Sequence, residues 1–178
     1  MLDDRTRWNT KYRDEIHHAN VNANLVRYAH LLKRGRVLDL AGGLGQNGAW
    51  LASQSNAFRV INTDISEEGA SRASNKTARV VADAARLPFP NHTFDTILNV
   101  RFFDPRVKFS EWLANGGTIF FETFTTADEK YRPDFNPAHR FDLARIPEIF
   151  RGLEILRQYE TDDGKRFYVT VIARRGDS

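Results

Sequence analysis

Short apolar runs that alternate with longer polar stretches constrain the fold of this chain most strongly. Runs of four to eight residues of this kind suit strands that are buried on both faces of a sheet. Five of them occur, at residues 36–41, 58–63, 78–82, 95–100 and 117–124. The intervening stretches long enough for crossover helices are 47–54, 66–75 and 104–115. This alternation predicts an α/β domain with a parallel sheet.

The third of these stretches has the termination signals of a helix. Asp104 is a candidate N-cap, Pro105 stands at the first helical position, and Gly116 follows the last residue. A further helix is expected before the sheet, over residues 25–32, where apolar side chains recur at helical spacing and Gly35 follows as a stop.

The end of the chain follows a different pattern. Residues 153–161 and 166–175 are two strand-like runs, and the link between them is too short for a helix. Because this link contains Asp163 followed by Gly164, the two runs are expected to form an antiparallel hairpin. Five parallel strands and this hairpin make a sheet of seven.

Length and composition set the broad class of the protein. The 178 residues suit one domain, with residues 1–34 as an N-terminal helical cap region and 35–175 as the core. No apolar run approaches the ~20 residues of a membrane span, and the first thirty residues lack the apolar centre of a signal peptide. We therefore expect a cytoplasmic protein that does not enter a membrane.

Charge and cysteine content narrow the possible partners. The formal charge is +3, but no run of five like charges occurs, so the sequence gives weak support for nucleic-acid binding. The absence of cysteine excludes disulfides and thiolate zinc sites. His17 and His18 are adjacent on an expected helix and point apart, so no metal site is predicted.

A glycine-rich loop directly follows the first predicted strand. Gly43, Gly45 and Gly48 have the G-x-G-x-x-G spacing of a turn that binds a dinucleotide. In an open parallel sheet, ligands bind beyond the carboxyl ends of the strands. Acidic residues stand at the ends of the first three strands, and these are Asp39, Asp64 and Asp83.

The three acids decide between two classes of ligand for this loop. A pyrophosphate needs free backbone N–H groups and a helix N-terminus, and a neighbouring carboxylate would repel it. S-adenosylmethionine carries an ammonium, a sulfonium and a ribose diol, and it has no phosphate. Charge therefore favours S-adenosylmethionine over a nicotinamide dinucleotide, with Asp64 placed to accept hydrogen bonds from the ribose.

Four blocks of the sequence occur in a familiar order: RVLDLAGGLGQNGAWLA, VINTDISEEGASRA, VVADAARLPFPNHTFDTILNV and GGTIFFETF. Together they resemble the motifs of class I S-adenosylmethionine-dependent methyltransferases over residues 8–175. The resemblance implies a Rossmann-like, doubly wound α/β fold with a seven-stranded sheet, five parallel strands being followed by a C-terminal antiparallel hairpin. The leader WNTKYR and the segment after the fifth strand resemble small methyltransferases of the tellurite-resistance type.

This resemblance implies a set of cofactor-binding residues. Ala41 stands where the family usually has glycine, and Asn62 and Thr63 make the second strand more polar than is usual before its acid. The residues expected to bind S-adenosylmethionine are Tyr12, Asp39, Ala41, Gly43, Gly45, Asp64, Ile65, Asp83, Ala84 and Asn99.

The methyl acceptor is expected to bind under segments that arch over the carboxyl edge of the sheet. The loop 125–141 and residues 8–18 are predicted to close over the cofactor, with Tyr131, Phe135 and Phe141 offering apolar surface. Methyl transfer chiefly needs alignment, and a general base is optional. The polar candidates for catalysis are Arg101, Asp104, Tyr131, Arg132 and His139.

Several acceptor classes fit this sequence to different degrees. The stretch NVRFFDP contains Asn99 but lacks the Pro-Pro typical of methyltransferases that act on amino groups of DNA bases or glutamine. A small-molecule acceptor is favoured. The alternatives are an RNA methyltransferase that uses Phe102, Phe103 and Tyr131 for stacking, and a scaffold protein that binds the cofactor without catalysis. The sequence sets no oligomeric state.

Overall fold

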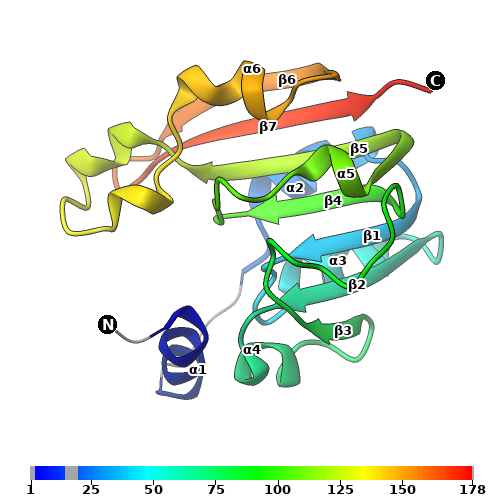
Figure 1. Ribbon diagram of the computed structural model, residues 1–178, viewed down its shortest axis with the longest axis horizontal. Helices are drawn as coiled ribbons and strands as arrows, with labels where there is room; N and C mark the ends of the chain where they lie inside the picture. The colour runs from blue at the N-terminus through cyan, green and yellow to red at the C-terminus, as the bar shows by residue number, and fades with distance from the viewer. Residues whose placement is uncertain (1–2, 15–19, 178) are drawn as a thin grey trace.

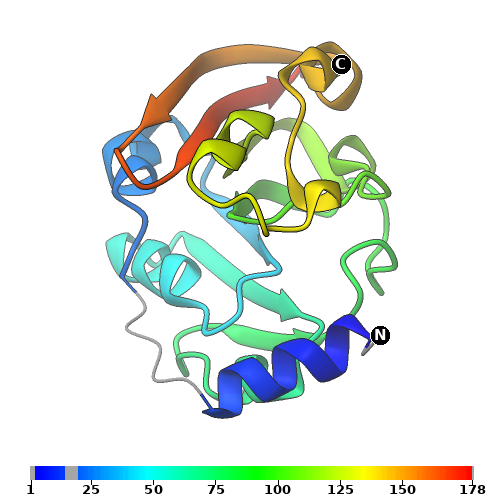
Figure 2. The ribbon, with the colours of Figure 1, turned by 90° about the vertical axis from the view of Figure 1, so that its left-hand side faces the viewer.

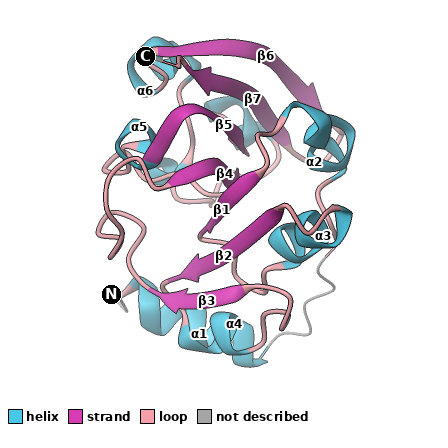
Figure 3. Cartoon of the chain, turned by 90° about the vertical axis from the view of Figure 1, so that its right-hand side faces the viewer, coloured by secondary structure: helices cyan, strands magenta, loops and turns pink. Residues whose placement is uncertain are grey.

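A computed structural model describes residues 3–14 and 20–177 of the chain. Its strands form one seven-stranded sheet in the order β3-β2-β1-β4-β5-β7-β6 (Figure 3). The first five strands pair in parallel, and β7 pairs antiparallel with both β5 and β6, which confirms the predicted fold class. The strands are β1 (Gly35–Leu40), β2 (Phe58–Asp64), β3 (Ala78–Val81), β4 (Phe94–Val100), β5 (Leu113–Phe124), β6 (Leu153–Asp162) and β7 (Phe167–Arg175).

Helices cover both faces of this sheet. Helices α2 and α3 lie on one face and α5 and α6 on the other (Figure 3). Successive side chains of a strand point to opposite faces, so Phe120 of β5 packs in the core that contains Leu25 and Leu51, while Phe121 packs in the core that contains Trp112. The α-helices are α1 (Asp4–Asp14), α2 (Ala23–Tyr28), α3 (Gln46–Gln54), α4 (Glu67–Ser71), α5 (Phe109–Trp112) and α6 (Ile146–Ile149).

The helix predicted over residues 104–115 was largely wrong. Only Phe109–Trp112 form a helix, and β5 already begins at Leu113. Leu113 is fully buried and pairs with Phe94 of β4. The residues that were expected to form the last turn of the helix therefore belong to the sheet. Asp104 caps no α-helix, because its carboxylate accepts hydrogen bonds from the backbone and side chain of Arg106.

The prediction that every parallel strand is buried on both faces was wrong for β3. This strand lies at the edge of the sheet and pairs only with β2. Three of its four residues are exposed, and the side chain of Val81 is among them. The helix that leads to it, α4, is also shorter than the stretch 66–75 that was predicted.

Two segments flank the carboxyl edge of the sheet, where β1, β2, β4 and β5 end. Helix α1 lies on one side of this edge and the segment after β5 on the other (Figures 1 and 2). The latter contains 3₁₀ turns at Thr126–Lys130, Pro137–His139 and Leu143–Arg145. Within the described residues, no helix is long and apolar enough to cross a membrane.

Phe141 corrects one prediction about this segment. Its side chain is fully buried and packs edge-to-face on Phe103 and Phe121. It therefore belongs to the core and does not offer apolar surface for a lid. Phe135 alone of the three aromatic side chains expected to form that surface lines the cavity described below.

Candidate functional site

A cavity of about 1050 Å³ opens at the carboxyl edge of the sheet. Helix α1, the glycine loop, the turns after β2, β3 and β4, and the segment after β5 all contribute to its wall. Its two ends differ in chemistry. One end contains the acids that follow β1 to β3, and the other contains arginine and aromatic side chains from β5, β7 and the segment between them.

Carboxylates bind the glycine loop to the sheet. Gly43 N donates to Asp64 Oδ2 at 2.8 Å, and Gly48 N donates to Asp39 Oδ2 at 2.9 Å. Gly43 and Gly45 have φ values of +55° and +67°, a region that glycine enters without strain. These two glycines are outside the cavity lining and shape the loop.

The departures of β2 from the family pattern have a structural role. Asn62 Nδ2 donates to the carbonyl of Gly43 at 3.0 Å, and the hydroxyl of Thr63 donates to the carbonyl of Asp39 at 3.3 Å. Asn62 therefore ties the glycine loop to β2, and Thr63 ties β2 to β1 just before the loop. Ala41 has a φ of +49°, in the left-handed region where the usual glycine would be unstrained.

Asp39 lies deep beneath the acidic end of the cavity. It is only 1% exposed, and burial raises the pKa of its carboxyl to about 7, against the opposing effect of the hydrogen bond from Gly48 N. The negative charge of Asp64 raises this pKa further. A cation bound in the cavity would stabilise the ionised form of Asp39.

Asp64 and Asp83 complete the acidic end. Asp64 also accepts from Ser66 N at 2.8 Å, and burial raises the pKa of its carboxyl. Each carboxylate oxygen can accept more than one hydrogen bond, so Asp64 can hold the loop and a ligand together. Asp83 lines the cavity and accepts from Ala85 N at 2.9 Å in the turn after β3.

Helix α1 covers the acidic end through Tyr12. The Tyr12 ring lies between the glycine loop and α4, and a methyl group added to Gly43 would collide with its phenol oxygen. Contacts between α1 and α4 are polar: the Ser66 hydroxyl donates to Asn9 Oδ1 at 2.7 Å, and Arg13 pairs with Glu68 at 3.0 Å. No described residue of α1 is buried, so these contacts and the Tyr12 ring hold it in place.

Replacing Gly43 with alanine is expected to displace α1. The strain of a side chain in the left-handed region is about 1–2 kcal/mol, and the collision with Tyr12 adds to it. Gly164→Ala is the matched control, because Gly164 has a φ of +80° and open space around its Cα. Trypsin should cleave at Arg7 and Lys11 at least threefold faster in Gly43→Ala than in the control. Equal rates would show that Tyr12 does not fix α1.

Seven of the ten residues predicted to bind the cofactor line this cavity, and so does most of the predicted acceptor set. The lining includes Tyr12, Asp39, Ala41, Asp64, Ile65, Asp83 and Ala84 at one end, and Arg101, Asp104, Arg132 and His139 at the other. His17, His18 and the rest of residues 15–18 lie outside the described residues, so their predicted role in closing the site stays a prediction.

Besides Gly43 and Gly45, two more predicted site residues are outside the cavity lining. Asn99 is fully buried, and its Nδ2 donates to the carbonyl of Phe102 at 2.8 Å, so it holds the turn after β4. Tyr131 donates to Asp162 Oδ1 at 2.6 Å, beside Lys130, and does not line the cavity. The Tyr131 hydroxyl is therefore bound at the end of β6 and not at the acceptor end of the cavity.

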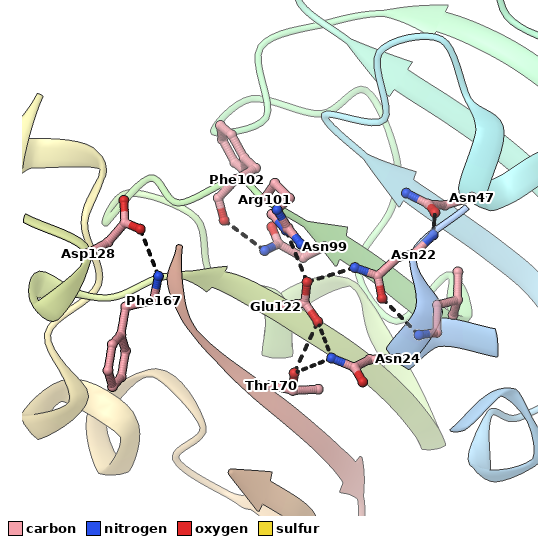
Figure 4. A network of polar contacts seen from close by, with 11 residues as sticks. Asn22, Asn24, Asn47, Asn99, Arg101, Phe102, Glu122, Asp128, Phe167 and Thr170 are labelled. Carbon is pink, nitrogen blue, oxygen red and sulfur yellow. Dashed lines mark hydrogen bonds and ion pairs between the residues drawn. The ribbon is translucent and has the colours of Figure 1, made fainter. Parts of the chain in front are cut away.

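Sequence reasoning missed Glu122, the centre of a buried polar network (Figure 4). Its carboxylate is fully buried and accepts hydrogen bonds from Asn22, Asn24, Arg101 and Thr170. A single acid in the otherwise apolar run of β5 was the available signal, since a buried charge must be paired. The network joins the segment before α2 to β5, β7 and the turn after β4.

Comparison with known families and structures agrees with this geometry. Residues 37–115 match the methyltransferase domain family. This part of the chain is similar to methyltransferase domains. The resemblance to class I S-adenosylmethionine-dependent methyltransferases is thereby confirmed over β1 to the start of β5, the part that carries the glycine loop and all three acids.

Solved structures similar to the methyltransferase domain extend the likeness of fold to almost the whole chain. An S-adenosylmethionine-dependent methyltransferase from Methanosarcina mazei has a TM-score of 0.69 at 18% identity, covering 90% of this chain and 100% of that one. Magnesium protoporphyrin IX methyltransferase from Synechocystis PCC 6803, with bound SAH, has a TM-score of 0.70 at 19% identity, covering 97% of each chain.

The same fold also occurs in a protein described by a different activity. The [4+2]-cyclase SpnF has a TM-score of 0.66 at 16% identity and covers 97% of this chain and 93% of that one. No curated protein sequence matches the chain. These three structures are all below 20% identical to the chain, so they show a shared fold alone.

Proposed function

We propose that the protein is an enzyme that transfers the methyl group of S-adenosylmethionine to a small-molecule acceptor. In this proposal residues 1–178 act as one domain, with residues 1–34 as the cap and 35–175 as the core. The observation that carries it is the acidic end of the cavity, where Asp39, Asp64 and Asp83 surround a glycine loop inside a methyltransferase domain.

The residues of the acidic end fit this cofactor. Asp64 would accept from the ribose hydroxyls, and Asp83 with Ile65 and Ala84 would contact the adenosine. The side-chain oxygen of Gln46 is buried, lines the cavity and has no hydrogen-bond partner among the described residues. Together with the Asp39 carboxylate it would accept from the ammonium of the cofactor.

The same loop is poorly suited to the pyrophosphate of a nicotinamide dinucleotide. Binding a phosphate there requires free backbone N–H groups, but Gly43 N and Gly48 N already donate to carboxylates. Gly45 N donates to the carbonyl of Gly42 at 2.9 Å. Charge and hydrogen bonding therefore both favour a cationic, phosphate-free cofactor.

The bound cofactor would supply a methyl group already activated for displacement by its sulfonium. The chain would contribute alignment of the acceptor and exclusion of water, which are the main requirements of this transfer. The cavity continues from the acidic end to Arg101, Asp104 and His139, so an acceptor placed there would share one cavity with the cofactor.

Two observations disfavour RNA as the acceptor. Phe103 is 4% exposed and packs on Phe141, and Tyr131 lies outside the cavity lining, so Phe102 is the one ring of the three expected to stack that remains available in the cavity. The acceptor end is part of a concave cavity of about 1050 Å³, the kind of site in which small molecules bind.

Titration calorimetry with S-adenosylmethionine, its demethylated product and NAD tests the cofactor. Either of the first two should bind, and NAD should bind poorly. Tighter binding of NAD than of both would overturn the proposal. Transfer of a radiolabelled methyl group to a panel of phenol, thiol and amine acceptors then separates an enzyme from a scaffold that only binds the cofactor.

Asp64→Ala should weaken cofactor binding at least tenfold. Hydrogen bonds to a charged group are worth about 1.5–3 kcal/mol each, and about 1.4 kcal/mol corresponds to a factor of ten. Asp95→Ala is the control, since Asp95 also accepts from a backbone N–H, that of Arg36 at 2.9 Å, but is outside the cavity lining. A lower melting temperature with unchanged affinity would leave Asp64 only its structural role toward Gly43 and Ser66.

A further inference from the structure

The guanidinium of Arg101 is held rigidly at the acceptor end of the cavity. Its Nε donates to Glu122 Oε1 at 3.0 Å, and its backbone N donates to the Glu122 carbonyl at 2.7 Å (Figure 4). The guanidinium carbon lies 5.1 Å from the centre of the Phe124 ring and 4.8 Å from that of Tyr168. One hydrogen bond and two ring faces therefore fix its plane.

The outer edge of this guanidinium is unused. Within residues 3–14 and 20–177, the two terminal nitrogens of Arg101 make no hydrogen bond or ion pair, although its side chain is 40% exposed and lines the cavity. The four hydrogen bonds that Glu122 accepts, from Arg101 and three neutral side chains, keep the counter-charge fully buried behind the guanidinium. Glu122 borders the cavity but is 0% exposed, so a molecule in the cavity can reach the positive charge of Arg101 more readily than the carboxylate.

The backbone of Arg101 supports a functional role. Its φ is +62°, a region in which a side chain costs free energy and glycine or asparagine is usual. A long cationic side chain at this position is retained against backbone preference. The turn after β4 thereby aims it into the cavity next to the place where the parallel strands end.

Two further arginines face the same space. Arg166 lines the cavity, and among the described residues its guanidinium donates only to the carbonyl of Lys165. Arg132 stacks between Phe124 and Phe135, and its partner Asp128 is fully buried. Two further carboxylates belong to this region. Asp163 accepts from backbone N–H groups of the hairpin turn, and the positive charges of Arg101 and Arg166 help to lower its pKa; Asp134 lines the cavity and is exposed.

We propose that Arg101 is the anchor for a carboxylate group of the methyl acceptor. A guanidinium edge with two parallel N–H groups matches the two oxygens of a carboxylate, and Arg166 supplies a second positive charge. The identity of the bound molecule as a methyl acceptor rests on the proposed function, but the carboxylate site itself does not. The substrate class is thus a small carboxylic acid with a nucleophilic group.

Benzoate and benzamide are the probes, because they differ only in the anionic group. Binding to the protein saturated with S-adenosylhomocysteine is followed by NMR of the arginine Nε–H signals. Benzoate should bind at least tenfold more tightly than benzamide and shift the Arg101 signal. Equal binding of the two probes, or no binding of benzoate at millimolar concentration, would overturn the proposal. Tighter binding of inorganic phosphate than of benzoate would also overturn it, in favour of a phosphoryl site.

Variants assign the site to Arg101. Arg101→Gln should lose at least tenfold in benzoate affinity. Arg101→Lys keeps the charge but loses the two parallel N–H groups, so its benzoate affinity should be intermediate. If Glu122 without its partner prevents folding, Arg101→Gln combined with Glu122→Gln removes both charges and serves the same purpose. Arg174→Gln is the control, since Arg174 pairs with Glu154 at 2.6 Å away from the cavity. Unchanged affinity in the folded Arg101 variants would exclude the anchor.

The proposed function and this anchor can fail separately. The benzoate titration is repeated without S-adenosylhomocysteine. If the cofactor does not bind but benzoate still shifts the Arg101 signal, the anchor stands and the methyltransferase proposal falls. If the cofactor binds and methyl transfer occurs, but only to neutral acceptors and independently of Arg101, the proposed function stands and the anchor is wrong.

Discussion

Asp39→Asn is expected to stabilise the protein at pH 8 and to weaken its binding of the cofactor. Burial raises the pKa of Asp39 from 3.8 to about 7 in the folded state. Between these values the folded protein retains a proton that the unfolded chain releases, so stability falls as the pH rises and levels off above the folded pKa. At about 1.36 kcal/mol per pKa unit, the full cost at pH 8 is about 4 kcal/mol.

Asparagine avoids this cost because it stays neutral and its oxygen can still accept from Gly48 N. For a domain of this size, about 4 kcal/mol corresponds to a rise of about 8–16 °C in melting temperature. Scanning calorimetry from pH 4 to pH 8 checks both the size and the direction, since the gap between variant and parent should close toward pH 4. A gap independent of pH would show that Asp39 is ionised throughout this range.

Glu122→Ala should destabilise the fold by at least about 2 kcal/mol, because hydrogen bonds to a charged group contribute about 1.5–3 kcal/mol each and the Glu122 carboxylate accepts several of them. The substitution leaves Arg101 Nε and the amides of Asn22 and Asn24 without their acceptor. Urea denaturation measures the loss. Glu154→Ala is the control, because its ion pair with Arg174 is exposed and such pairs contribute about 0–1 kcal/mol. Equal losses would mean that the buried network contributes no more than a surface ion pair.

The sequence predicted those parts of the fold that depend on local pattern. Apolar runs and the Asp-Gly link predicted all seven strands, because burial on two faces gives the inner strands a continuous apolar run and a short link permits only a hairpin. The edge strands β3 and β6 were also found, although both are largely exposed. The prediction of a helix at 104–115 was wrong at its end because Leu113 pairs with Phe94 of β4. The local sequence gives no signal for this contact.

The candidate site was predictable where its residues follow strands directly. Asp39, Asp64 and Asp83 lie together because parallel strands end at one edge of the sheet. Glu122 was missed because its role depends on partners far away in the sequence, at Asn22 and Thr170. Tyr131 was misplaced for the same reason, since its partner Asp162 belongs to a different element.

The position of β7 between β5 and β6 has a consequence for synthesis of the chain. Until residues 167–175 leave the ribosome, β6 has no neighbour to pair with, one side of β5 is open, and the Glu122 carboxylate lacks Thr170. Strand pairing over such sequence distances forms late, because the loop-closure entropy must be overcome first. Nascent chains that end before Phe167 should therefore be sensitive to proteases, and Arg101 should acquire its fixed orientation only when the last strand inserts.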